Sequence, residues 1–223
     1  MRPSARATGA GSPARATGAG ESVAKRLTDL GVASVLLAIA APVVLTAAAA
    51  VAMTIGWPPW YRQVRTGRGM RPFVMYKLRS MSNARDARGE LLPDGDRLTR
   101  LGRFLRRSSI DELPGLINVI RGDLSLVGPR PLLPRYDPWY TDRERLRFTV
   151  RPGITGLAQV SGRNTVCWDD RLEFDVRYVE DWTYELDLRI LSRTAAKLVH
   201  RGGVVENPTE LMADLDEERS GRE

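Results

Sequence analysis

The chain has 223 residues, which is the length of one domain or of one domain with a small appendage. Its single cysteine, Cys167, excludes an internal disulfide framework, and one cysteine with one histidine, His200, is too few ligands for a zinc site. A Ser-His-Asp or Cys-His triad is also disfavoured, because His200 would have to be its base. Any bound metal is therefore expected to be a hard ion held by carboxylates.

The charge is unevenly distributed along the chain. The net charge is +7, but residues 61–163 carry +11 and residues 164–223 carry −7. Such a basic block predicts an anionic partner, which leaves nucleic acid, a phospholipid surface or a phosphorylated small molecule open.

The first 21 residues are mostly alanine, glycine, arginine, serine, threonine and proline, and the string Ala-Arg-Ala-Thr-Gly-Ala-Gly occurs in them twice. Residues 2–20 have no large apolar side chain and cannot bury a core, so residues 1–21 are predicted to be a disordered tail.

A long apolar segment follows. Residues 31–55 are nearly all apolar, and at about 1.5 Å per residue a helix of this length reaches roughly 37 Å, enough to cross a bilayer core. We expect a membrane anchor over residues 22–60, kinked at Pro42, where the ring removes a helical hydrogen bond.

The anchor has two possible topologies. Basic residues flank it on both sides, with Lys25 and Arg26 before it and four arginines between 62 and 71 after it. Positive charge favours the cytoplasmic side, so a re-entrant helix that bends at Pro42 is favoured over a single span. Trp57, Trp60 and Tyr61 are typical of an aromatic belt at the membrane interface.

The rest of the chain alternates short elements. Strand-like runs at 61–65 and 73–79 predict a β-hairpin, in which Lys77 and Arg79 share one face. Residues 83–97 are expected to form a polar loop. Helices are predicted at 98–107, 113–121, 144–148, 169–182 and 187–200. The expected fold class is α+β and mostly helical, with a compact domain over residues 61–207, interfacial amphipathic helices and a loose acidic tail over 208–223.

Adjacent carboxylates at Asp111 and Glu112 stand just before the helix predicted at 113–121, downstream of an arginine-rich run that includes Arg106. One interpretation is structural: Asp111 caps the helix, and Ser109 with Glu112 forms a capping box. The other is chemical, because paired carboxylates among arginines are what Mg²⁺-dependent phosphoryl transfer requires. The spacing alone leaves both open.

Two further stretches are candidates for binding anions. Gly-Pro-Arg-Pro at 128–131 holds Arg130 in an extended backbone, which suits either a phosphate clamp or a tight turn. The glycine-rich stretch 151–163 has Arg151 and Arg163 at its ends, but it does not match a P-loop.

Together these pieces resemble the bacterial sugar transferases, the monotopic polyprenyl-phosphate phosphoglycosyl transferases. The resemblance runs from about residue 23 to 203. The matching motifs are Lys-Arg-Leu-Thr-Asp at 25–29 with the apolar segment and its proline, Gln-Val-Arg-Thr-Gly at 63–67, Tyr-Lys-Leu-Arg-Ser-Met at 76–81, Leu-Gly-Arg-Phe-Leu-Arg at 101–106, Ser-Ile-Asp-Glu-Leu-Pro at 109–114, Gly-Asp-Leu-Ser-Leu-Val-Gly-Pro-Arg-Pro at 122–131, and Arg-Pro-Gly-Ile-Thr-Gly at 151–156. The chain departs from the family pattern at Ala41, where serine is frequent, and at Ala158, where tryptophan is frequent.

The resemblance implies transfer of sugar-1-phosphate from a UDP-sugar to a membrane polyprenyl phosphate on the cytoplasmic face, an early membrane step of exopolysaccharide or other glycoconjugate synthesis. It implies that Asp111 is the nucleophile, that UMP leaves, and that an aspartyl-phosphosugar forms. Mg²⁺ is the implied cofactor, with Asp111 and Glu112 as its ligands. The implied phosphate-binding residues are Lys77, Arg79, Arg106, Arg130, Arg151 and Arg163.

A second hypothesis is a non-catalytic, membrane-tethered basic module that binds anionic lipid or nucleic acid. It explains the anchor and the basic block, but it has no use for the Asp111–Glu112 pair. Nucleic acid is not expected as a partner, because few aromatic residues lie among the arginines and no known binding motif is present. Self-association into a homo-oligomer stays open.

Overall fold

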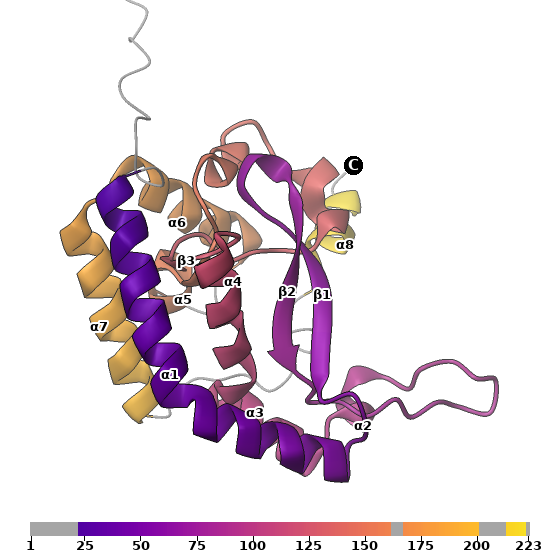
Figure 1. Ribbon diagram of the computed structural model, residues 1–223. Coiled ribbons are helices and arrows are strands. Elements are labelled where there is room, and N and C mark those ends of the chain that lie inside the picture. The colour runs from indigo at the N-terminus through magenta and orange to yellow at the C-terminus, as the bar shows by residue number, and fades with distance from the viewer. Residues whose placement is uncertain (1–21, 162–166, 201–212, 222–223) are drawn as a thin grey trace, which may run out of the picture.

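The computed structural model describes residues 22–161, 167–200 and 213–221 (Figure 1). The tail predicted over 1–21 and the candidate Arg163 lie outside these residues. The α-helices are α1 (Val23–Thr54), α2 (Asp94–Arg97), α3 (Arg100–Ser108), α4 (Leu116–Arg121), α5 (Leu157–Ser161), α6 (Trp168–Glu180), α7 (Tyr184–His200) and α8 (Leu215–Ser220). The 3₁₀ helices are η1 (Arg68–Met70), η2 (Ile110–Gly115), η3 (Pro134–Trp139) and η4 (Glu144–Thr149). The strands are β1 (Trp60–Thr66), β2 (Pro72–Leu78), β3 (Ser125–Val127) and β4 (Gly153–Thr155). The predicted α+β, mostly helical class is confirmed.

Helix α1 is the predicted apolar anchor. It runs for 32 residues with Pro42 inside it, and Figure 1 shows that it changes direction part way along its length, as a helix interrupted by proline does. An apolar stretch of α1 is long enough to cross a membrane by length and composition. Only 17% of that stretch is buried against the rest of the protein, which distinguishes it from the core helix of a soluble domain. A long apolar helix that packs little against its own domain is what a membrane anchor requires.

The start of α1 belongs to the folded domain. Lys25 is 5% exposed, and its Nζ donates to Asp187 Oδ2 on α7 at 2.5 Å. Asp29, one turn later, accepts a hydrogen bond from Ser125 Oγ at 2.7 Å. Arg26 donates to the carbonyl oxygens of the last turn of α4. Lys25 and Arg26, which the sequence suggested as a basic flank of the anchor, thus bind partners far along the chain, and the topology that this flank favours stays a prediction.

Strands β1 and β2 form the predicted antiparallel hairpin, with Tyr61 opposite Lys77 and Arg65 opposite Phe73. Helix α4 is tied to β2 by Asn118, which is fully buried. Its side-chain nitrogen donates to the carbonyl of Val74 at 2.7 Å, and its oxygen accepts from the amide of Tyr76 at 3.1 Å. The hairpin is thereby attached rigidly to the elements that follow it.

A second, parallel pair joins β3 to β4, which the sequence pattern did not predict. The two backbones approach so closely that a Cβ atom on Gly128 would lie 2.5 Å from the carbonyl oxygen of Arg151. The amide of Gly153 donates to the carbonyl of Pro129 at 2.9 Å. Glycine at 128 and 153 therefore lets this pair hold the segment that carries Arg130.

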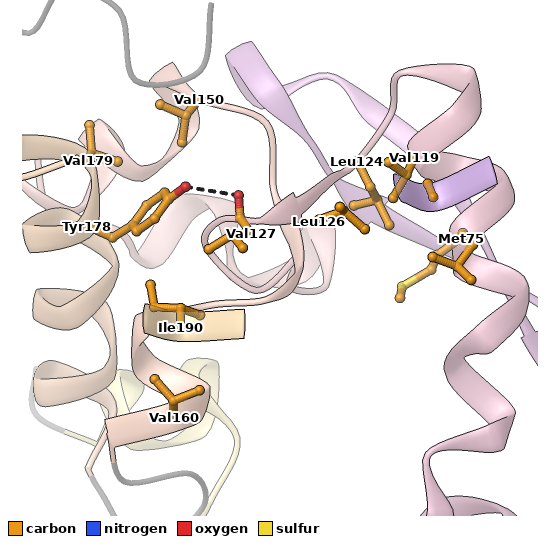
Figure 2. Close-up of a cluster of buried hydrophobic side chains, with 12 residues drawn as sticks. Met75, Val119, Leu124, Leu126, Val127, Val150, Val160, Tyr178, Val179 and Ile190 are labelled. Carbon is orange, nitrogen blue, oxygen red and sulfur yellow. Dashed lines mark hydrogen bonds between the residues drawn. The ribbon is translucent and has the colours of Figure 1, made fainter. Parts of the chain in front are cut away.

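The main core lies between the helices and these strands. Figure 2 shows its buried side chains, with the Tyr178 hydroxyl donating to the carbonyl of Val127 at 3.0 Å. A second buried cluster contains Tyr136, Trp168 and Leu215.

The last described helix differs from the expected loose tail. In α8, Leu215 is fully buried, and Asp214 accepts a hydrogen bond from the Tyr136 hydroxyl at 2.6 Å. Asp214 and Glu217 also form a capping box at the start of the helix. The acidic composition suggested solvation, but one leucine and a capped turn are enough to dock residues 213–221.

Candidate active site

The two carboxylates lie on η2, between α3 and α4. Helix α3 ends at Ser109, which has a left-handed backbone with φ of 56°, and the chain then forms a 3₁₀ turn before α4 begins. The predicted capping box is wrong, because the Ser109 side chain makes no capping hydrogen bond and the Glu112 carboxylate binds two cations instead. Asp111 lies in the first turn of η2 rather than at a helix N-cap.

Asp111 is buried but not bonded. Its exposed fraction is 7%, and within the described part of the chain no group donates a hydrogen bond to its carboxylate. Burial, together with the neighbouring charge of Glu112, raises the pKa of Asp111 to about 6, although Lys77, Arg106 and Arg130 act in the opposite direction. A poorly solvated carboxylate of raised pKa is a competent nucleophile that is still ionised at neutral pH.

Glu112 is the centre of a charge cluster. Its Oε1 accepts from Lys77 Nζ at 2.8 Å and from Arg130 Nη2 at 3.1 Å. Burial alone would raise the pKa of Glu112, but these two cations outweigh it and hold the pKa well below its ordinary value. Lys77 comes from β2 and Arg130 from the segment after β3, so three distant parts of the chain meet at this carboxylate.

The backbone of Arg130 is held from behind by a buried ion pair. Arg147 Nη2 donates to the carbonyl of Arg130 at 2.6 Å and to Asp175 Oδ2 at 2.7 Å. The side chains of Arg147 and Asp175 are 2% and 4% exposed. The guanidinium of Arg147 also lies 5.5 Å and 5.2 Å from the ring centres of Tyr140 and Phe148. Arg130 thus projects a half-exposed guanidinium from a fixed backbone.

Arg65, near the end of β1, is a residue that the sequence analysis did not place in the site. Burial, and then repulsion from Arg130, lower its pKa to about 10. The signal was present in the motif at 63–67 and in the hairpin register, which places Arg65 and Lys77 on the same face. Nothing in the strand pattern itself distinguished Arg65 from its neighbour Arg62.

The remaining predicted phosphate ligands divide into two groups. Arg106 on α3 donates to Ser80 Oγ at 3.0 Å, and its charge acts on Asp111. Arg151 donates to the carbonyl of Gly122, which follows the C-terminal end of α4. The carboxylates on η2 lie at the N-terminal end of α4, so the structure does not bring Arg151 to them. Arg79 lies just beyond β2 and has no side-chain ion pair within the described residues.

The expected Mg²⁺ site can be tested against the donor set. Among the described residues, no three His, Cys, Asp or Glu side chains lie close enough together to hold a metal ion. Asp111 and Glu112 offer carboxylate oxygens alone, and one oxygen of Glu112 already binds two cations. Mg²⁺ is commonly held by one or two carboxylates with substrate phosphates supplying further oxygens. The residues therefore fit a magnesium ion that is shared with a bound diphosphate.

The chain thus combines an apolar helix long enough to cross a membrane with a carboxylate pair surrounded by cations. The bacterial sugar transferase family matches residues 20–201, so the chain belongs to that family, and the resemblance carried by its motifs is confirmed.

Three relatives narrow the class. The chain is 49% identical over 182 residues to an uncharacterized sugar transferase, EpsL, of Bacillus subtilis, covering 82% of this chain and 90% of the relative. It is 42% identical over 185 residues to a UDP-glucose:undecaprenyl-phosphate glucose-1-phosphate transferase of Caulobacter vibrioides, covering 78% and 69%. It is 39% identical over 196 residues to an undecaprenyl-phosphate galactose phosphotransferase of Salmonella typhimurium, covering 80% and 41%. The expected enzyme class, a phosphoglycosyl transferase, is supported by these relatives.

Proposed function

We propose that this enzyme transfers sugar-1-phosphate from a UDP-sugar to a membrane polyprenyl phosphate. The observation that carries the proposal is Asp111, a buried carboxylate that accepts no hydrogen bond from the described residues, beside Glu112, which Lys77 and Arg130 neutralise. The substrates named for the Caulobacter and Salmonella relatives are of this kind. A non-catalytic basic module would have no use for an unbonded, buried carboxylate at the centre of its positive charge.

The transfer occurs in two displacements at one phosphorus atom. First, a carboxylate oxygen of Asp111 attacks the β-phosphorus of the donor, the bond to the bridging oxygen breaks, and UMP leaves with the electron pair. The lipid phosphate then attacks the aspartyl-phosphosugar, which gives polyprenyl-diphosphate-sugar and restores the carboxylate. Both attacking groups are already anionic, so no histidine base is needed.

The surrounding residues stabilise negative charge on the phosphates. Lys77 and Arg130 lie within hydrogen-bonding distance of Glu112 and can shift toward the donor, while Arg106 faces Asp111. A Mg²⁺ ion held by Asp111, Glu112 and the diphosphate would add charge neutralisation when bound.

For the membrane anchor, we propose the re-entrant topology, with the domain on the cytoplasmic face. Both ends of α1 are attached to the same folded body: Lys25 and Arg26 bind α7 and α4 at one end, and Trp60 begins β1 at the other. A straight span would separate these two ends by the thickness of a bilayer. Apolar side chains along the helix face outward between them, among them Ile39, Val43, Leu45 and Met53.

The proposed anchor would place the site at the membrane surface. Helix α1 packs against η2, the turn that carries Asp111. Helix α3 shows an exposed Phe104 flanked by arginines, as expected of an interfacial helix. A lipid phosphate at the headgroup level would then lie close to the nucleophile.

The function is tested by incubating the detergent-solubilised protein with Mg²⁺, undecaprenyl phosphate and a panel of UDP-sugars while UMP is measured. At least one UDP-sugar is expected to release UMP in a lipid-dependent manner. Absence of release from every donor, by protein that still binds anionic vesicles, would favour the non-catalytic module.

The topology is tested by cysteine labelling in intact cells, with Cys167 first replaced by serine. Single cysteines introduced as Ser12→Cys and Ser82→Cys are both expected to resist a membrane-impermeant thiol reagent until the cells are opened. Labelling at position 12 alone would demonstrate a true span. Pro42→Leu restores the missing helical hydrogen bond and is expected to favour that spanning form.

A further inference from the structure

Arg65 is a partly buried cation that forms no ion pair with any described residue. Its Nη2 donates to Gln63 Oε1 at 2.6 Å, and its Nη1 reaches the carbonyl of Pro131 at 3.5 Å. Its Nε is buried and has no hydrogen-bond partner. Among the described residues, no carboxylate forms an ion pair with Arg65, although Glu112 pairs with both Lys77 and Arg130.

Such an arrangement is unfavourable without a ligand. A partly buried guanidinium loses hydration, and an unsatisfied buried donor typically costs about 1–3 kcal/mol. Arg130 lies near enough to repel Arg65, and the lowered pKa of Arg65, about 10, reflects both effects. Arg65 nevertheless stays protonated at neutral pH. An anion placed between the two guanidinium groups would offset the charge of Arg65 and relieve the repulsion.

The position of Arg65 indicates which part of a diphosphate it would reach. Arg130 contacts Glu112, whereas Arg65 contacts the carbonyl of the next residue, Pro131, and neither carboxylate. Arg65 therefore extends the row of cations beyond Arg130. In an in-line displacement the leaving oxygen lies opposite the attacking one, so the end of the row remote from the nucleophile faces the leaving group.

We infer that Arg65 binds the α-phosphate of the nucleotide-sugar donor, the phosphate that departs in UMP. This inference rests on the proposed function. When the bond from the β-phosphorus to the bridging oxygen breaks, the electron pair stays on that oxygen and UMP gains negative charge. The planar fork of Arg65 offers paired donors to this developing charge, so it stabilises both bound UMP and the transition state of the first step.

The experiment measures UMP binding by titration calorimetry on the purified full chain in nanodiscs with Mg²⁺, alongside donor and acceptor KM values. The variants are Arg65→Gln, Arg65→Lys and the control Arg62→Gln, in which the replaced side chain lies on the opposite face of the same strand and is exposed. We expect Arg65→Gln to weaken UMP binding and to raise the donor KM at least about tenfold, with the KM for the lipid acceptor changed less than about twofold. The UMP affinity and donor KM of Arg65→Lys are expected to lie between those of the wild type and of Arg65→Gln, because lysine keeps the charge and loses the planar fork.

Wild-type UMP affinity in Arg65→Gln would overturn the inference, as would an equal loss in Arg62→Gln. If Arg65→Gln does not fold, Arg65→Lys decides, and wild-type affinity in that variant would overturn the inference. If the wild type releases no UMP from any UDP-sugar, the proposed function fails separately. In that case, if UMP binding still depends on Arg65, the inference that Arg65 binds the nucleotide phosphate would stand. If the wild type does not bind UMP either, both the inference and the proposed function would be overturned.

Discussion

Two buried clusters in this molecule are built from similar charged residues. In one of them the charged groups have hydrogen-bond and ion-pair partners, and in the other some of them do not. At the start of α1, Lys25 pairs with Asp187 at 2.5 Å and lies 3.8 Å from Asp29. Hydroxyl groups complete the set, with Tyr178 donating to Asp187 at 2.8 Å and Ser125 donating to Asp29 at 2.7 Å. On η2 and β1, by contrast, the described residues donate no hydrogen bond to Asp111 and offer no partner to the buried Nε of Arg65.

The difference separates structure from function. Buried polar groups in a folding core are normally satisfied, because each unsatisfied group costs stability. A buried guanidinium nitrogen without a partner, close to a carboxylate that accepts no hydrogen bond from the described residues, is an arrangement typical of a binding site. The cluster on α1 therefore attaches this helix to the domain, and the cluster on η2 has the properties expected of the proposed substrate site.

The sharpest test of this comparison is Asp111→Asn, for which we expect UMP release to fall at least about 10⁴-fold, ~5.4 kcal/mol, because an amide cannot accept the phosphoryl group. Folding is expected to be kept or improved. The folded pKa of Asp111, about 6, lies above its ordinary value of 3.8, so ionised Asp111 destabilises the folded state as pH rises through this window. Removing the charge at pH 7.5 is expected to raise the free energy of unfolding by up to about 3 kcal/mol. Turnover like that of the wild type would disprove the nucleophile assignment.

The complementary test breaks the satisfied cluster. Asp187→Asn leaves the ammonium of Lys25 buried without its main partner, so we expect the free energy of unfolding to fall by about 3–5 kcal/mol. The control is Glu185→Gln on the same helix, where the pair with Arg189 is exposed and worth about 0.3–0.5 kcal/mol. Thermal melting in detergent measures both. Equal melting temperatures for the two variants would contradict the anchoring role of Lys25.

How far the sequence could predict the molecule depends on how local the determinants are. The apolar run of α1, the hairpin and helices α6 and α7 follow from periodicity within each segment. The ion pair of Lys25 could not be predicted, because its partner Asp187 is 162 residues away along the chain. The β3–β4 pair escaped prediction for a similar reason, since three-residue strands have no measurable period.

The site shows the same division. The carboxylate pair, Lys77 and Arg130 stood out because the spacing and the family motifs marked them. Arg151 was predicted alongside them, yet the fold uses it to bind a backbone carbonyl beyond α4. Whether an arginine faces the carboxylates or a helix end depends on tertiary packing, which spacing does not encode.

Arg130→Lys tests the arginine that contacts Glu112 with its side chain and binds the buried Arg147 through its backbone carbonyl. The substitution keeps the charge and loses the planar fork, so we expect transfer to fall at least about tenfold, roughly 1.4 kcal/mol. Arg143→Lys serves as the control, because Arg143 is 52% exposed and pairs with surface glutamates on α6. Steady-state UMP release measures both variants. An unchanged rate in Arg130→Lys would make Arg130 a turn residue only.

The smallest expected effect is the pH dependence of the first step. In the proposed mechanism Asp111 attacks as a carboxylate, so the rate is expected to be half-maximal near pH 6, the folded pKa of Asp111, and to fall about tenfold at pH 5. The lipid phosphate has its own ionisation near this pH, as phosphate monoesters do. The measurement is therefore a single-turnover burst of UMP with donor alone and no acceptor.

Melting curves taken over the same pH range serve as the control, because they separate ionisation of the nucleophile from loss of fold. Because Asp111 is buried, its pKa should lie well above that of an ordinary aspartate, although the charges of Lys77, Arg106 and Arg130 lower it. If the rate instead became half-maximal near pH 4, the Asp111 carboxylate would be solvated before the donor binds. The contrast between the incomplete cluster and the satisfied one on α1 would then lose its physical basis, because an exposed carboxylate completes its hydrogen bonds with water.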